Sequence, residues 1–162
     1  MKKTSVFTML LLLALLAAAS GVSARSNTHF EAHLSGGSEV PPNSSKAAGQ
    51  AVFRVVDGGN AIEYRLIVAS LDDLHMAHIH RAPAGANGGI VVWLYPSAPP
   101  AVHLPGTTNG VLAVGRITAA NLTGPLAGQP LSVLIDAMAA GNTYVNVHTM
   151  SFPGGEIRGQ IK

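Results

Sequence analysis

Two histidines spaced two residues apart, His78 and His80, are the side chains best placed to do chemistry. Alternate residues of an extended strand share a face, which puts the two Cβ atoms roughly 6.5–7 Å apart on one side. A helix would turn the same side chains about 200° apart. Two imidazoles at the strand spacing can converge on one metal ion, each placing a nitrogen about 2.0–2.1 Å from it. The spacing therefore predicts a metal site on a strand, with polar surface or a hydrogen-bonded core as the alternative.

A third histidine, His148, ends a segment that also has the alternation of a strand. Val145 and Val147 share one face of it. Tyr144, Asn146 and His148 share the other face, which is polar. If this strand and the first histidine strand border the same cavity, three imidazoles meet there.

The chain has seven histidines and no cysteine, so imidazole is the ligand available for a metal of borderline softness. Affinity rises toward copper along the first-row divalent ions, which favours Cu(II), with Zn(II) next. Met76 has the strand parity of the first two histidines, and its thioether would favour Cu(I); filling a gap in the packing is the alternative. His75 and His103 are further candidate ligands.

A buried polar network is the alternative to a metal site, because hydrogen-bonded histidines can fix the register of strands. Glu156 and Arg158 share a strand face and could pair with each other or with a neighbouring strand, a structural role. The residues expected to support the histidines, as a second shell or as structure, are Asn146, Glu156 and Arg158.

No pattern in the chain indicates catalysis by side chains alone. No Ser-His-Asp set, paired catalytic carboxylates or cofactor fingerprint can be read, although a triad can also form between residues far apart in sequence. The segment Asn87-Gly88-Gly89 predicts a turn, since no Lys-Ser/Thr pair or helix start follows that would make it a phosphate loop.

Short strands joined by turns are predicted for most of the chain. The hairpin signal Asp57-Gly58-Gly59-Asn60 joins two of them, and the segment 90–95, which has no polar break, is expected to be a central strand. The strands expected are 30–34, 49–56, 61–70, a histidine strand that ends at about 81, 90–95, 110–117, 144–149 and 156–161.

The remaining segments are predicted to be connections and one helix. Residues 96–109 contain four prolines and are expected to form a long irregular connection near a site. Residues 118–131 are rich in turn formers. Residues 131–140 favour a short helix, with a strand as the alternative. The whole pattern indicates an all-β antiparallel sandwich or barrel and lacks alternating βαβ units.

The N-terminus has the pattern of a signal peptide over residues 1–24, cleaved after Ala24, with an uncleaved anchor as the alternative. This predicts a secreted or periplasmic protein with no membrane span in the mature chain. Loss of Lys2 and Lys3 reduces 10 basic residues to 8, against 8 acidic ones, so no basic stripe remains for nucleic acid. Without cysteine, the domain has no disulfides.

Five blocks spread over residues 28–162 resemble the signature blocks of the chordin (CHRD) domain family. In chain order they are Ser38–Pro42, Ala77–Pro83, Asn87–Val92, Tyr144–Thr149 and Pro153–Gln160. In animals this domain recurs in chordin, an extracellular antagonist of bone morphogenetic proteins, whereas bacterial relatives are mostly exported single-domain proteins of unassigned role. The resemblance implies an exported domain over residues 28–162 and an extracellular protein partner. His75, Met76 and the proline-rich segment around His103 depart from the family pattern.

A weaker resemblance is to copper/zinc superoxide dismutase, in which a His-x-His strand and a later histidine hold copper. His78, His80 and His148 match those positions by type and order. The metal-bridging imidazole, the zinc-site Asp cluster and the disulfide have no counterparts, so a mononuclear three-histidine site is what this resemblance implies. Together the two resemblances imply a Greek-key β-sandwich or barrel, superoxide dismutase-like or immunoglobulin-like.

Three functions follow as alternatives. The first is an exported binding module that holds one copper or zinc ion with three histidines. The second is an extracellular protein-interaction module without metal. The third is a superoxide dismutase-like copper redox enzyme, which needs an open coordination position that substrate can reach.

Overall fold

The computed structural model describes residues 28–162, so the expected signal peptide lies outside the described residues. Antiparallel strands dominate this part of the chain, and the predicted all-β class is confirmed. The strands are β1 (His29–Ser35), β2 (Ala48–Val56), β3 (Ala61–Arg81), β4 (Gly89–Tyr95), β5 (Leu104–Ile117), β6 (Thr143–Thr149) and β7 (Ile157–Gln160). One α-helix, α1 (Leu131–Ala139), and four short 3₁₀ turns join them, at Gly36–Ser38, Asp57–Gly59, Ala119–Asn121 and Gly124–Leu126.

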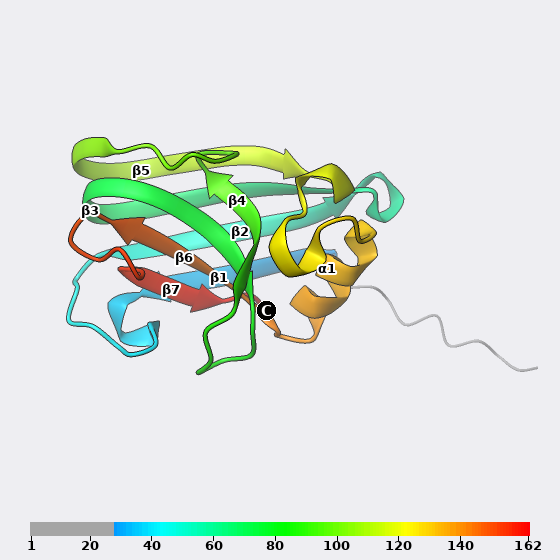
Figure 1. Cartoon of the computed structure of the whole chain (residues 1–162), viewed down its shortest axis with the longest axis horizontal. Helices are drawn as coiled ribbons and strands as arrows, with labels where there is room; N and C mark the ends of the chain where they lie inside the picture. Colours follow the sequence, from blue (N-terminus) through cyan, green and yellow to red (C-terminus); the bar gives the residue numbers. More distant parts are fainter. Residues whose placement is uncertain (1–27) are drawn as a thin grey trace, which may run out of the picture.

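Five of the strands form a closed barrel. They follow one another in the order β2, β1, β7, β6 and β3, and the pairing of β2 with β3 closes the ring. Strands β4 and β5 pair with β3 outside the ring. Helix α1 lies at one end of the barrel (Figure 1).

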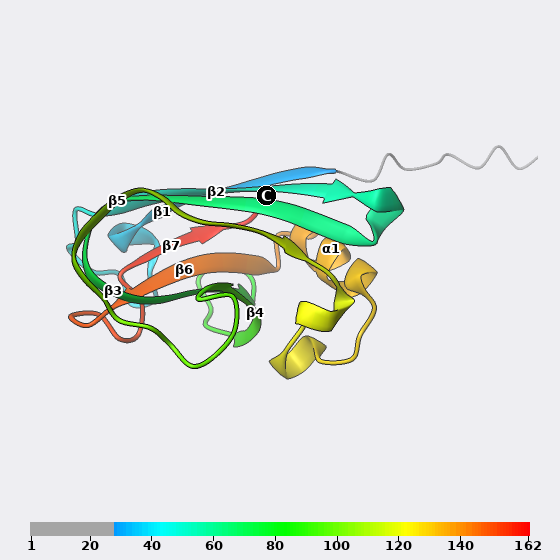
Figure 2. The same ribbon diagram turned by 90° about the horizontal axis from the view of Figure 1, so that it is seen from above.

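Strand β3 is continuous over 21 residues, whereas the sequence analysis expected two strands. Ser70 and Asp73 have positive φ values of 58° and 50°, and the register with β5 shifts on either side of Leu71. These irregularities bend the strand without ending it, as β-bulges do. Its first half pairs with β2 and its second half with β6 and β4. Figure 2 shows β3 curling at one end of the molecule, from the layer of β1 and β2 to the layer of β6 and β4.

Two further expectations about the strands are wrong. Strand β4 pairs only with β3 and is therefore an edge strand, not a central one. Its apolar run reflects the burial of Val91, Val92 and Leu94 in the core. Strand β5 begins at Leu104, so the second part of the expected irregular connection is a strand. The bend in β3 offers these residues backbone partners, with Leu104 opposite Leu74.

The core fills the inside of the barrel. In β1 the buried residues alternate with exposed ones, so one face of this strand packs in the core and the other meets solvent. Helix α1, predicted over residues 131–140, is confirmed, and it buries Leu131, Leu134, Ala137 and Met138 at the end of the barrel. No helix in residues 28–162 has both the length and the apolar character needed to cross a lipid bilayer.

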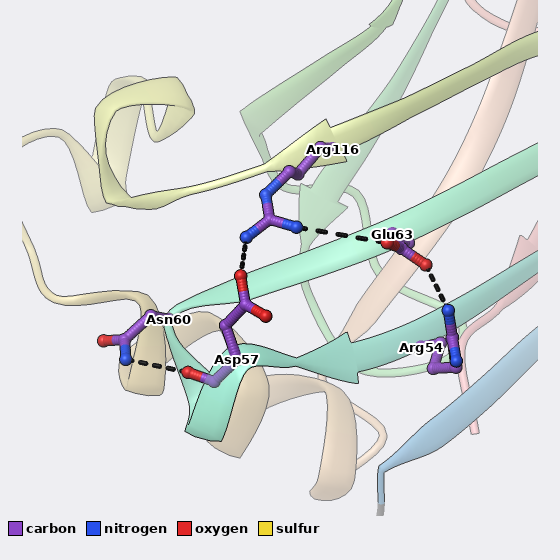
Figure 3. A network of polar contacts seen from close by, with 5 residues as sticks. All are labelled: Arg54, Asp57, Asn60, Glu63 and Arg116. Carbon is purple, nitrogen blue, oxygen red and sulfur yellow. Dashed lines mark hydrogen bonds and ion pairs between the residues drawn. The ribbon is translucent and has the colours of Figure 1, made fainter.

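The predicted hairpin between β2 and β3 is confirmed, with Gly58 at a φ of 64°. The Asn60 side-chain amide donates to the Asp57 carbonyl, and the Asp57 carboxylate pairs with Arg116 of β5 (Figure 3). Arg54 and Glu63 pair across β2 and β3 at 2.6 Å. These ion pairs are half-exposed, so each contributes only about 0–1 kcal/mol, and their role is to align the three strands.

The contact between β7 and β1 leaves no room for a side chain at Gly159. A Cβ there would lie 2.7 Å from the carbonyl carbon of His33, and backbone cannot yield as a flexible side chain can. We expect Gly159→Ala to lower the free energy of unfolding by about 2 kcal/mol or more, measured by urea denaturation. Gly154→Ala is the matched control, because a Cβ at Gly154 meets nothing within 4 Å. Equal stability of the two variants would contradict this account of barrel closure.

Candidate metal centre

The structure brings His78, His80 and His148 together. One nitrogen of each ring lies within 4.8 Å of the others. The first two come from the second half of β3, and the third comes from the end of β6. Residues directly opposite in an antiparallel pair share a face. Because Met76 lies opposite His148 and His78 lies opposite Asn146, all these side chains project from the same side of the sheet.

The histidine face points away from the barrel interior, because the alternate residues Ala77 and Ile79 belong to the core. The three histidines are nevertheless buried, with exposed fractions of 0%, 8% and 5% in chain order. Connecting segments cover them. The loop between β3 and β4 and the segment between β6 and β7 both contact the histidines through backbone carbonyls. A polar face of the sheet has thereby become an enclosed site.

Two backbone carbonyls fix the protonation of two rings. The Nδ1–H of His80 donates to the Gly88 carbonyl at 2.8 Å, and the Nδ1–H of His148 donates to the Pro153 carbonyl at 3.0 Å. A carbonyl oxygen only accepts, so each ring carries its hydrogen on Nδ1 and has a lone pair on Nε2. Metal-ligating histidines use the same arrangement, in which the second ring nitrogen donates to a carbonyl or carboxylate.

The third ring, His78, is hydrogen-bonded to His148. Nδ1 of His78 lies 3.3 Å from Nε2 of His148 and donates to it, which leaves Nε2 of His78 unprotonated. Within residues 28–162 the Nε2 atoms of His78 and His80 are buried without a hydrogen-bond partner, as are Glu39 Oε1, Thr143 Oγ1 and Asn146 Oδ1. Native proteins rarely leave buried polar atoms unpaired, so the two Nε2 atoms need an explanation.

Burial keeps all three imidazoles neutral. It lowers the pKa of His78 to about 3, with smaller contributions from the charges of His148 and His80. It lowers the pKa of His148 to about 4, although the hydrogen bond to Pro153 opposes the shift. The pKa of His80 is lowered mainly by burial as well, and the hydrogen bond to Gly88 and the neighbouring side chain of Asn146 oppose the shift. A metal ion binds the neutral imidazole, so near pH 7 all three histidines are in the charge state that a metal ion requires.

Aromatic rings frame the site. The edge of Trp93 meets His78 at a centroid distance of 4.3 Å, and Tyr144 stacks on His80 at 4.8 Å with an interplanar angle of 8°. The guanidinium carbon of Arg158 lies 3.4 Å from the Tyr144 centroid, a cation–π contact. Arg158 also donates to the Ala86 carbonyl at 2.7 Å and so tethers the covering loop.

The residues expected to support the histidines take different positions. Asn146 lies between His78 and Arg158 in one row across β3, β6 and β7. Arg158 contacts the ring of Tyr144, which in turn stacks on His80. Glu156 accepts hydrogen bonds from Ser45 and Thr149, each at 2.6 Å, and so ties the segment before β2 to β6.

Of the three further candidate ligands, the histidines His75 and His103 are not part of the cluster of three. Met76 is half-buried on the histidine face, opposite His148. The charge of His75 contributes to the lowered pKa of His148, after burial and the charge of His80. His103 is half-exposed, and its Nε2 lies 3.2 Å from Asp73 on the bend of β3.

Sequence reasoning missed Glu39 and Trp93. Glu39 is buried, its Oε1 has no hydrogen-bond partner, and burial raises its pKa to about 7 against the charge of Arg158 and the Val40 N–H. The only signal in the sequence is a lone carboxylate beside two prolines. Trp93 lies opposite His78 across β3 and β4, a register that depends on the covering loop.

The lowered histidine pKa values predict how stability depends on pH. Between about pH 6.5 and pH 4 the unfolded chain binds protons at His78 and His148 that the folded protein does not bind. The free energy of unfolding of the metal-free protein therefore falls as the pH decreases through this range, and the contribution is fully present above pH 6.5. Urea denaturation should show a smaller slope for His148→Gln than for the exposed control His33→Gln. Equal slopes would contradict the buried, neutral ring.

The raised pKa of Glu39 predicts that its contribution to the free energy of unfolding changes with pH in the opposite direction. Its raised pKa stabilises the fold fully below pH 4.5, and this contribution is lost as the pH rises to about 7. Relative to the wild type, Glu39→Gln should gain stability over that range, by at most about 3 kcal/mol. Denaturation at pH 4.5 and pH 8 measures the difference, with the exposed Glu31→Gln as control. If the stability difference between Glu39→Gln and the wild type is the same at both pH values, the Glu39 carboxyl has an ordinary pKa in the folded protein.

The comparisons with known proteins agree with the architecture. A family model for the CHRD domain matches residues 30–161. No curated protein and no solved structure matches the chain. The matched residues run from β1 to the end of β7 and include all three histidines of the cluster. Because the match covers the whole barrel, the chain belongs to the CHRD domain family.

Proposed function

We propose that this protein is an exported binding module that holds one copper ion with His78, His80 and His148, with zinc as the next candidate. CHRD domains are generally extracellular binding modules, which supports the general class. The cluster of three histidines supports the ligand set. The single observation that carries the proposal is the pair of buried, unpartnered Nε2 atoms of His78 and His80.

The alternative of a purely structural polar network explains these atoms less well. A buried polar atom without a partner costs about 1–3 kcal/mol. In a network that serves only stability, neighbouring donors would satisfy the lone pairs. Here the Gly88 carbonyl uses the Nδ1 hydrogen of His80, and His78 donates its own Nδ1 hydrogen to His148, so the Nε2 lone pairs of His78 and His80 meet no donor. That orientation favours a cation as the missing partner.

The chain's own residues would do four things for the ion. The histidines provide three neutral ligands, and the two backbone carbonyls orient them. Trp93 and Tyr144 pack against the rings and shield them from water. Arg158 holds the covering loop over the site. Copper or zinc would supply a Lewis-acid centre there, but the enclosure favours holding an ion over turning over a substrate such as superoxide.

Thermal unfolding of the metal-stripped chain that begins at Arg25 tests the proposal. A ligand that binds only the folded state at about 100 times its Kd adds about 2.7 kcal/mol. For a domain of this size we expect Cu(II), and to a lesser extent Zn(II), to raise Tm by roughly 10 °C. The double variant His78→Ala/His80→Ala should lose the increase, whereas His29→Ala/His33→Ala, which removes two exposed histidines of β1, should keep it. A wild-type Tm that neither zinc nor copper in either oxidation state changes would contradict the proposal.

A protein-interaction module is the second candidate, and strand β5 is the observation that favours it. Among the strands of residues 28–162 this strand pairs with β3 alone, so its other edge could add a strand from a partner. Val111 and Val114 are 48% and 66% exposed on it. If this edge binds a partner, Val111→Lys/Val114→Lys should abolish binding to the cell surface or matrix without changing the metal response.

A further inference from the structure

The ligand set of the site carries no negative charge. All three groups are imidazoles, and no carboxylate of residues 28–162 joins the cluster. The Born cost of moving an ion from water into a site of low dielectric grows with the square of its charge. The desolvation free energy of a divalent ion is therefore about four times that of a monovalent ion in the same neutral site.

The enclosed site also lacks the open fourth position that usually completes the coordination of a divalent ion. A zinc ion on three histidines is completed by a water or a substrate in a fourth, open position. Here the Nε2 atoms of His78 and His80 are buried, and the rings of Trp93 and Tyr144 pack on those two imidazoles. A three-coordinate ion fits this arrangement better than a four-coordinate one, and Cu(I) commonly takes three ligands.

The nearest fixed charge also opposes a divalent ion. Arg158 is 2% exposed, always protonated, and separated from His80 only by the stacked ring of Tyr144. A cation bound to the ring of His80 would therefore be repelled by this guanidinium.

We propose that the site selects a monovalent soft cation, Cu(I), over Zn(II) and Cu(II). This inference rests on the proposed function, because it assigns the charge and oxidation state of the ion that the same three histidines hold. Met76 lies opposite His148 on the histidine face, and a thioether beside the three imidazoles favours Cu(I) over harder ions. The protein would then bind cuprous ion outside the cytoplasm without cycling between oxidation states.

The single tryptophan of the chain provides the readout. Trp93 lies 4.3 Å from His78, so its fluorescence should change when a metal binds. The metal-stripped protein is titrated without oxygen with Cu(I) in the presence of a competing Cu(I) chelator. Separate titrations use Zn(II) and Cu(II), each with its own chelator. Ag(I) serves as a monovalent ion that does not change oxidation state.

We expect Cu(I) to bind with a Kd at least 100-fold below those of Zn(II) and Cu(II), and Ag(I) to change the Trp93 emission in the same way. His78→Ala should lose the Cu(I) response, whereas His29→Ala/His33→Ala should keep it. Zn(II) or Cu(II) binding as tightly as Cu(I) would overturn this inference and leave the proposed metal site standing. Failure of every metal to bind the folded wild type would overturn both.

Discussion

The bend in β3 is the constraint on which the rest of the structure depends. A straight strand of this length would extend beyond the barrel, but the positive φ values at Ser70 and Asp73 turn the chain while its pairing continues. The first half can then close the barrel against β2. The second half lies in the opposite layer, where it presents His78 and His80 beside β6. Barrel closure and the histidine site are thus two results of one bend.

The bend alone would leave the histidines on a wet surface. They become buried because segments far apart in the sequence fold over them, and each segment is attached by specific hydrogen bonds. The Gln160 side chain donates to the Ala82 carbonyl, Arg158 donates to the Ala86 carbonyl, and the Asn87 side chain donates to the Val40 carbonyl. These bonds satisfy most polar groups of the cover. The Nε2 atoms of His78 and His80 are among the five buried side-chain atoms of residues 28–162 that lack a hydrogen-bond partner.

Much of this arrangement could be predicted from the sequence, because it depends on the alternation of side chains along strands. Parity alone placed His78 and His80 on one face and His148 on a polar face of another strand, and the structure brings the three together. The Asp57–Asn60 hairpin and the helix over residues 131–140 were predicted by equally local signals and are confirmed.

What the sequence could not predict depends on tertiary contacts. The bend of β3 uses Ser70 and Asp73 at positive φ, where local signals point to glycine, so the strand appeared to be two. The edge position of β4 could not be read, since its buried residues resemble those of a central strand. Glu39 reaches the surroundings of Arg158 only because the segment before β2 folds across the sheet. Sequence alternation carries no information about such covering segments.

The central claim is that three imidazole nitrogens hold one metal ion. X-ray absorption spectroscopy of the protein loaded with one equivalent of copper tests it most directly, because the spectrum reports the number, type and distance of the ligand atoms. The account predicts three nitrogen neighbours at about 2.0 Å, with the outer-shell scattering of three imidazole rings. A spectrum dominated by oxygen ligands, or one that fits a single imidazole, would contradict the account and indicate that the histidines serve the architecture of the barrel.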